Sequence, residues 1–243
     1  MSVVFTVEGN VDPLLHAHLD RGDTLFCESG AMVAMDERLS LSGKARGGVF
    51  SSIGRKLLND ESFFQQKIEA KMGEGNVLLS PALPGAVRVL DVGIGHQYTI
   101  ADGCYLANTD GVELSIGTQG IGKAIFASTG SGLKGFFTMK TGGIGQVAVS
   151  GFGALAEVEV TEDTPIIIDN GHLVAWDSTL KYELAMNLAH KGFMGTMVES
   201  ITAGTIVVLK FTGRGKIIVC TRNREDFVKW MGKTLPNPDD SRK

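Results

Sequence analysis

The sequence predicts an all-β protein, and three observations support this fold class. Glycine is abundant while proline is scarce, with 32 glycines and 6 prolines among 243 residues. Short runs rich in β-branched and aromatic residues alternate with turn signals such as Asp-Gly and Asn-Gly. These runs also recur in a similar order three times along the chain. Many short strands joined by tight turns account for all three observations.

The most regular landmark is a G-x-G turn. Gly75, Gly145 and Gly215 lie in GEGNVLLS, GIGQVAVS and GRGKIIVC, with the same spacing between successive copies. An apolar run precedes each turn and another follows it. Two alternating strands around a glycine turn are typical of a β-hairpin, in which glycine supplies the positive φ.

A second landmark supports the same periodicity. The segment SGAMVAMD (29–36) resembles NGHLVAWD (170–177), and TDGVELS (109–115) is their middle counterpart. Each is preceded by a strand-like run, and these runs are TLFCES, CYLANT and PIIIDN. We therefore predict three β units, at residues 1–84, 85–152 and 153–222, followed by a tail at 223–243. The units should pack side by side and share a hydrophobic core.

The tail predicts a short helix. In Arg224–Gly232, Phe227, Trp230 and Met231 recur at helical spacing, and acidic residues near the start suit a helix N-terminus. We expect this helix to pack on the β body, with its tryptophan serving as a packing residue.

Bulk properties limit the function classes. The net charge of −4 argues against general affinity for nucleic acid, which depends on Lys and Arg at phosphates. Cys27, Cys104 and Cys220 are odd in number and form no C-x-x-C pair, so we expect reduced thiols. The sequence shows neither a secretory signal nor a transit peptide, and it has no apolar run long enough for a transmembrane segment. These features predict a cytoplasmic protein.

The stretch QVAVSGFGALA (146–156) contains G-x-G-x-x-A, the pattern of a dinucleotide-binding turn. Such a turn must open a helix whose N-terminus faces the phosphates. Here AEVEVTEDT (156–164) alternates with strand period, and Pro165 follows. We therefore predict a strand-to-strand joint between the second and third units, and no nucleotide cofactor.

One possible metal site is present in the first unit. His16 and His18 are two residues apart, so on a strand both imidazoles lie on one face, and Asp23 follows. The layout is similar to the first metal motif of cupins, except that the cupin ligand at the position of Asp23 is glutamate. No second motif supplies another histidine. Our prediction is no metal site, with His16, His18 and Asp23 as the weak candidates for one.

Loosely clustered basic residues occur in the three glycine-rich connections of the units. If the three connections lie on one side of the packed units, this side could attract RNA, but aromatic residues for base stacking are sparse. The same connections could contact a membrane surface or a protein partner. The basic residues are Lys44, Arg46, Arg55, Lys56, Lys123, Lys134, Lys181 and Lys191.

Together, the triple organisation, the paired SGAMVAMD and NGHLVAWD segments and the G-x-G turns resemble the family named after altered inheritance of mitochondria protein twenty-four. The resemblance covers essentially the whole chain. It implies three tandem units similar to the tryptophan RNA-binding attenuation protein, each a compact double-stranded β-helix. It also implies a homotrimer that forms a pseudo-ninefold ring, a relation to mitochondrial biogenesis proteins, and no established catalytic residues.

We therefore expect a non-enzymatic structural, scaffold or interaction protein without a cofactor, whose principal partner is itself. Two alternatives remain open. One is a ring that binds RNA or a small ligand, as the tryptophan attenuation protein does. The other is a cupin-like metal-dependent enzyme that uses His16, His18 and Asp23.

Overall fold

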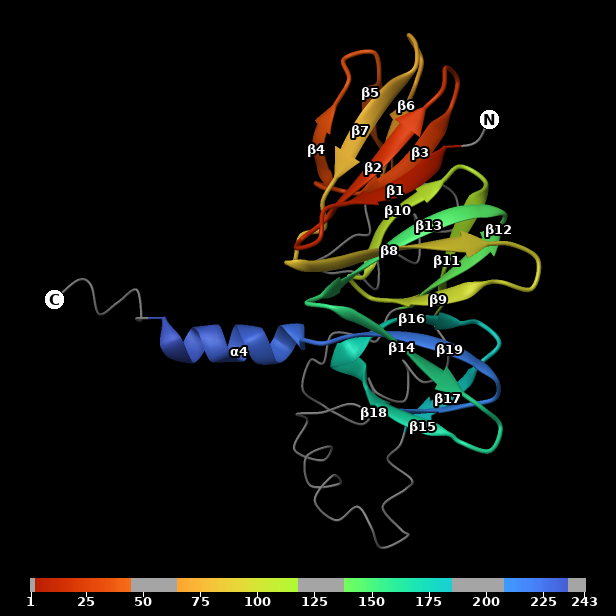
Figure 1. The fold of residues 1–243 in the computed structure, drawn as a ribbon, viewed down its shortest axis with the longest axis vertical. Helices are drawn as coiled ribbons and strands as arrows, with labels where there is room; N and C mark the ends of the chain where they lie inside the picture. The colour runs from red at the N-terminus through yellow and green to blue at the C-terminus, as the bar shows by residue number, and fades with distance from the viewer. Residues whose placement is uncertain (1–2, 45–64, 118–137, 185–207, 236–243) are drawn as a thin grey trace, which may run out of the picture.

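The structure is a computed structural model that describes residues 3–44, 65–117, 138–184 and 208–235. Within these ranges the chain is built almost entirely of β-strands, and one α-helix follows them (Figure 1). The all-β prediction with a short C-terminal helix is confirmed. The strands are β1 (Val4–Glu8), β2 (Leu14–Leu19), β3 (Thr24–Glu28), β4 (Met32–Met35), β5 (Ser40–Lys44), β6 (Gln65–Glu69), β7 (Gly75–Leu79), β8 (Gly85–Val92), β9 (Tyr98–Ala101), β10 (Tyr105–Thr109), β11 (Val112–Gly117), β12 (Thr138–Gly143), β13 (Gly145–Phe152), β14 (Leu155–Val160), β15 (Ile166–Asp169), β16 (Leu173–Asp177), β17 (Lys181–Leu184), β18 (Val208–Thr212) and β19 (Gly215–Cys220).

Strand pairing follows one order three times. The order β2–β7–β4 recurs as β8–β13–β10 and as β14–β19–β16. A second order, β5–β6–β3, recurs as β11–β12–β9 and as β17–β18–β15. We call each such set of three strands a triplet. Triplets join edge to edge at two places, because β3 pairs with β10 and β9 pairs with β16. Figure 1 shows the result as a column of strand layers that runs from red to blue along the chain. The unit boundaries at residues 84, 152 and 222 stay a prediction.

The hairpins predicted around the G-x-G turns are wrong. The strands β6 and β7 flank the first turn, yet β6 pairs with β3 and β5 whereas β7 pairs with β2 and β4. The turns before β13 and β19 also connect strands of different sheets. Alternating hydrophobicity gives each strand one buried face, which suits two facing sheets as well as one shared sheet. The G-x-G turn therefore crosses from one sheet to the facing sheet.

The alignment of the middle unit also needs correction. Sequence similarity placed the run CYLANT beside TLFCES and PIIIDN. In strand order, β10 instead occupies the position of β4 and β16, and β9 is the counterpart of β3 and β15. A backbone bulge supports this assignment, because the pairing register shifts at the same point in β4, β10 and β16.

The evenly spaced glycines allow close packing. A side chain at the second glycine of each turn would collide with a residue at the end of the neighbouring strand or shortly after it. A Cβ at Gly215 would lie 2.8 Å from Asp177 Oδ2, and one at Gly145 would overlap Thr109 Oγ1. The positive φ expected of the turn belongs to the first glycine in two cases, with +77° at Gly143 and +107° at Gly213.

The hydrophobic core forms three clusters that cross the triplet junctions. The first cluster combines Leu15, Leu25 and Ile68 with Leu106 and Ala107 of β10. The second combines residues of β8 and β13 with Val174 and Ala175 of β16. The third lies between β14–β19 and Ala101 of β9. Because these clusters share residues across the junctions, neighbouring triplets stabilise one another by burying a common apolar surface.

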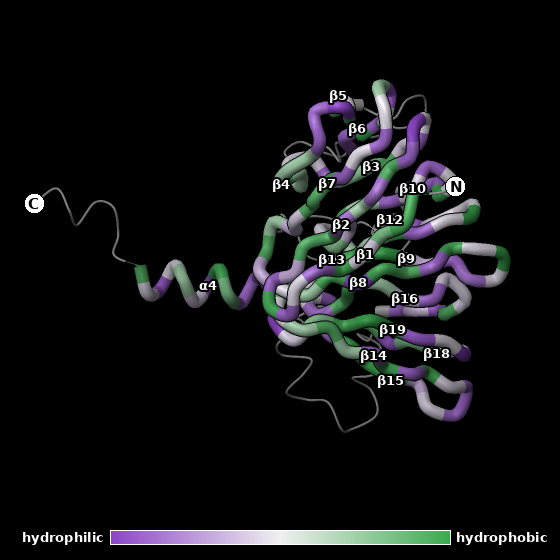
Figure 2. Tube along the Cα trace, turned by 45° about the horizontal axis from the view of Figure 1, so that its top comes forward, coloured by the Kyte–Doolittle hydropathy of each residue, from purple (hydrophilic) through white to green (hydrophobic). Residues whose placement is uncertain are grey.

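The C-terminal helix, α4 (Arg224–Thr234), projects from the column in both views (Figures 1 and 2). Its N-cap is Asn223, whose side-chain oxygen accepts hydrogen bonds from the backbone N–H groups of Glu225 and Asp226. The prediction that the helix packs on the β body holds only for its first turns, and no residue of α4 is buried. In the described ranges no helix has both the length and the apolar character needed to span a membrane.

Candidate functional site

The predicted histidine pair lies on one face of β2, as the two-residue spacing requires. His16 Nδ1 is 2.6 Å from Glu8 Oε1, and His16 Nε2 is 3.1 Å from Asn76 Oδ1. His18 Nδ1 is 3.0 Å from the same Asn76 oxygen. Both imidazoles therefore contact one amide on the neighbouring strand β7.

Asp23 does not join this pair. Its carboxylate accepts a hydrogen bond from the backbone N–H of Asp20 at 3.0 Å and so closes the turn between β2 and β3. The residues that approach His18 are instead Asp20 and Glu74, whose oxygens lie with a His18 ring nitrogen within 4.8 Å of one another. Sequence spacing could not find Glu74, because only the β2–β7 register brings its turn beside Asp20.

The segment QVAVSGFGALA forms the joint that its strand period predicted. The chain runs from β13 through Gly153 into β14, and therefore no helix starts at these glycines. Gly151 is required by packing, since a Cβ there would contact Leu155, Val174 and Cys220. The pattern thus has a structural explanation in this protein.

A more informative surface is the edge of β4. This strand has the same place in its triplet as β10 and β16, which pair with β3 and β9. In the described part of the chain nothing pairs with the outer edge of β4, where the first sheet ends. Exposure measures the difference: the bulge residue Val33 is 55% exposed, while its counterparts Leu106 and Val174 are 0% exposed.

The edge of β15 is the complementary surface at the other end of the column. This strand has the place of β3 and β9, but it ends the fourth sheet and pairs only with β18 among the described residues. Ile167 is 36% exposed, whereas its counterparts Phe26 and Thr99 are 4% and 1% exposed. Among the described residues, the column therefore ends in two unpaired edges whose counterparts are joined to each other inside the chain.

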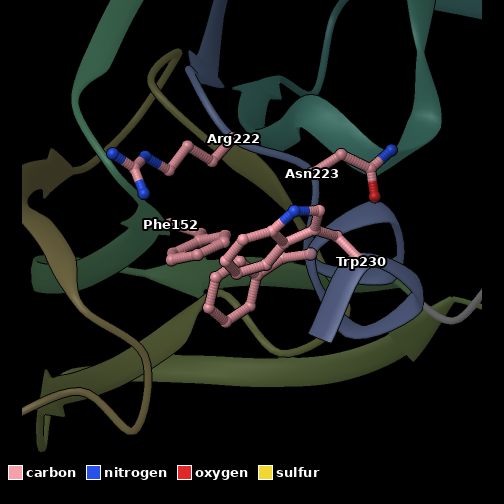
Figure 3. Close-up of a pocket in the computed structure, with 5 residues that line it drawn as sticks. Phe152, Arg222, Asn223 and Trp230 are labelled. Atoms are coloured by element: carbon pink, nitrogen blue, oxygen red, sulfur yellow. The ribbon is translucent and has the colours of Figure 1, made fainter. Parts of the chain in front are cut away.

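An aromatic pocket lies where α4 leaves the β body (Figure 3). It has a volume of about 460 Å³. The ring of Phe227 contacts Phe152 edge to face at 5.0 Å and stacks on Trp230 at 5.9 Å, and the Arg222 guanidinium lies 5.7 Å from the Phe152 ring centre. Trp230 remains 59% exposed, so its expected role as a packing residue is only partly met. Asn223 completes the lining.

The three cysteines carry free thiols in this structure. Burial raises the pKa of Cys27 to about 12, and the negative charge of Glu28 adds to this effect. Burial also raises the pKa of Cys104 and of Cys220. Thiols that are protonated at neutral pH are poor nucleophiles and poor metal ligands, so these residues act as small hydrophobic groups.

Comparison with known proteins places the chain in a family. Residues 5–222 match the family model described as Mitochondrial biogenesis AIM24. An uncharacterized protein of Streptococcus pyogenes serotype M6 is 31% identical over 239 residues, which cover 96% of this chain and 91% of that protein. The X-ray crystal structure of a Streptococcus pyogenes protein has a TM-score of 0.74 and 30% identity, covering 96% of this chain and 100% of that one. On these grounds, the chain belongs to the Mitochondrial biogenesis AIM24 family.

Proposed function

We propose that this protein is a non-enzymatic scaffold that assembles head to tail with copies of itself. In this assembly β15 of one copy pairs with β4 of the next, and three copies close into a ring. The number three comes from the family resemblance. The observation that carries the proposal is the contrast in exposure between Val33 and its buried counterparts Leu106 and Val174.

The internal junctions specify the register of the proposed contact. Ala107 pairs with Cys27 and Asn108 with Phe26 at the first junction, and Ala175 pairs with Ile100 at the second. Transferring this register to the free edges predicts three pairs between copies, namely Ala34 with Ile168, Met35 with Ile167 and Asp36 with Ile166.

The proposed contact would remove two unfavourable surfaces. An unpaired strand edge exposes backbone N–H and C=O groups that can pair with another chain. Val33 and Ile167 would also leave water, and burying one such side chain contributes roughly 1.5–3 kcal/mol. A head-to-tail contact uses two different surfaces, so it builds a ring when its rotation closes and a filament when it does not.

The first test is oligomeric state, measured by size-exclusion chromatography with light scattering at micromolar concentration. The unmodified protein should have three times the chain mass, and Val33→Asp should shift it toward the monomer. The control is Ile94→Asp, because Ile94 is 92% exposed in the turn after β8. A monomeric unmodified protein, or an intact trimer with both V33D and an additional Ile167→Asp, would contradict the proposal.

The second test is the register. Oxidation of the double variant Met35→Cys/Ile167→Cys should produce covalent multiples of the chain, since the two sulfurs would face one another across the new pair. The control variant Met35→Cys/Asp169→Cys moves one cysteine two residues along the same face and should cross-link much less. Equal cross-linking of both variants would reject the register.

A further inference from the structure

A cluster of possible metal ligands lies at the end of β2 and shares no residue with the aromatic pocket. We propose that His18, Asp20 and Glu74 bind a divalent transition-metal ion such as Zn²⁺. One imidazole nitrogen and two carboxylates form a ligand set of the kind that such ions accept, with remaining positions open to water. This proposal is independent of self-assembly, because the ligands all come from a single chain.

The backbone holds the three ligands in place. His18 and Asp20 are two residues apart at the end of β2, and the β2–β7 register pairs Leu19 with Gly75, so the residue before Gly75 comes to lie opposite Asp20. The turn after Asp20 is closed by a hydrogen bond from its N–H to Asp23 Oδ2. Ligands fixed by strand pairing and a tight turn lose little freedom when they bind an ion.

The neighbouring amide determines which nitrogen of His18 is free. Asn76 donates from its backbone N–H and from Nδ2 to Asp36 Oδ2, at 2.7 and 3.3 Å. This leaves Asn76 Oδ1 as an acceptor, so His18 Nδ1 must donate to it. In the neutral ring the lone pair is then on Nε2, which lies 3.6 Å from Asp20 Oδ1. A hydrogen bond on the second nitrogen is the arrangement that orients metal-bound histidines.

Three acceptors converge at this point. The Nε2 lone pair of neutral His18 and the carboxylates of Asp20 and Glu74 repel one another unless a cation lies between them. Glu74 forms no ion pair with any residue in the described ranges under a 4 Å limit, although the Arg38 side chain, including Nη1 of its guanidinium, passes close to Gly73. His16 is not a ligand, because both of its ring nitrogens already contact oxygen acceptors.

The fold does not require these residue types at these positions. In the third unit, the β14–β19 register pairs Glu159 with Lys216 and Val160 with Gly215, so Glu159, Thr161 and Arg214 occupy the corresponding positions. A histidine with two carboxylates therefore occurs here where the same strand geometry elsewhere carries different chemistry.

The test is calorimetric titration of the full-length, tag-free protein with ZnCl₂, repeated with CoCl₂. We expect one saturable site per chain, with a dissociation constant on the order of micromolar because the ligands are only three and partly exposed. His18→Gln should abolish this site, and Asp20→Asn or Glu74→Gln should each weaken binding by at least about tenfold. The matched controls His16→Gln and Glu159→Gln should bind within about threefold of the unmodified protein.

Histidine ring NMR gives a second readout that does not depend on affinity. Zn²⁺ should shift the Nε2 signal of His18 while leaving Nδ1 protonated, and it should leave the ring-nitrogen signals of His16 unchanged. The proposal would be overturned if no saturable binding were seen up to about 0.1 mM Zn²⁺, a concentration roughly 100 times the expected Kd. Unchanged binding in H18Q, or coordination shifts on His16, would overturn it as well. If the three side chains bind only a proton, the titration shows no saturable Zn²⁺ binding.

Discussion

Asn108 organises a buried polar network at the junction of β3 and β10, and its replacement by leucine is a direct test of that junction. The side chain is 0% exposed. Its amide donates to the carbonyl oxygens of Thr109 and Val112 at 2.8 and 3.0 Å. Its oxygen accepts from Tyr105 Oη at 2.6 Å and from Gln65 Nε2 at 3.2 Å.

Asn108→Leu keeps the number and branching of the side-chain heavy atoms, and its two methyl groups are larger than the amide atoms that they replace. No cavity forms, so the loss of hydrogen bonds dominates. A buried hydrogen bond contributes about 1 kcal/mol net, and a buried group left without a partner costs about 1–3 kcal/mol. Tyr105 Oη retains the Phe26 carbonyl and the Gln65 amide, so the main penalty falls on the two backbone carbonyls. The burial of apolar leucine offsets part of it, which leaves a destabilisation of roughly 3 kcal/mol.

The assay is urea unfolding of both proteins at one fixed protein concentration, because self-association would otherwise alter apparent stability. The control is Ser115→Ala, which removes an exposed 3.4 Å hydrogen bond to Lys140 and should cost less than about 0.5 kcal/mol. Tyr105→Phe should lie between the two variants. A loss below about 1 kcal/mol for N108L would refute the reasoning that this network stabilises the junction.

The remaining predictions concern ionisable groups. At pH 8 a thiol-reactive disulfide reagent should modify Cys27, Cys104 and Cys220 only slowly in the folded protein, because burial raises the pKa of each thiol. The same reagent should react rapidly after unfolding, and a fast reaction with the folded chain would contradict this prediction. Hydrogen bonds from the backbone and side chain of Asn76 lower the pKa of the Asp36 carboxyl from its ordinary value of 3.8. The stability that ionised Asp36 contributes is therefore present above pH 3.8 and is lost as the pH falls through the lowered pKa. Unfolding curves of Asp36→Asn and the unmodified protein should therefore converge as the pH falls below 4, and a pH-independent difference would count against this assignment.

The local predictions succeeded where a short-range rule decides the outcome. Alternation of apolar residues marks strands such as β14, and it correctly excluded a helix after Gly153. The helical spacing of Phe227, Trp230 and Met231, together with the acidic residues near its start, predicts α4. The two-residue spacing of His16 and His18 correctly placed both rings on one face of β2.

The errors concern strand partners. Alternation specifies which face of a strand is buried, but it does not specify which strand lies beside it. The strands around the G-x-G turns therefore looked like hairpins, although they belong to facing sheets. Asp23 fits the cupin-like spacing after His16 and His18, but spacing along the chain does not specify which carboxylate lies beside an imidazole in space.

By itself, the sequence determined the all-β class, the positions of most strands, the terminal helix and the family, since each depends on local periodicity or on recurring motifs. Only the tertiary structure decided that β3 pairs with β10 and β9 with β16, and that Glu74 lies beside His18 and Asp20. It also decided that the outer edges of β4 and β15 have no corresponding strand partner in the described part of the chain. The physical reason is that strand pairing and register are fixed by burial of core residues far apart in the chain. Local patterns carry no information about which distant strands pair or in which register.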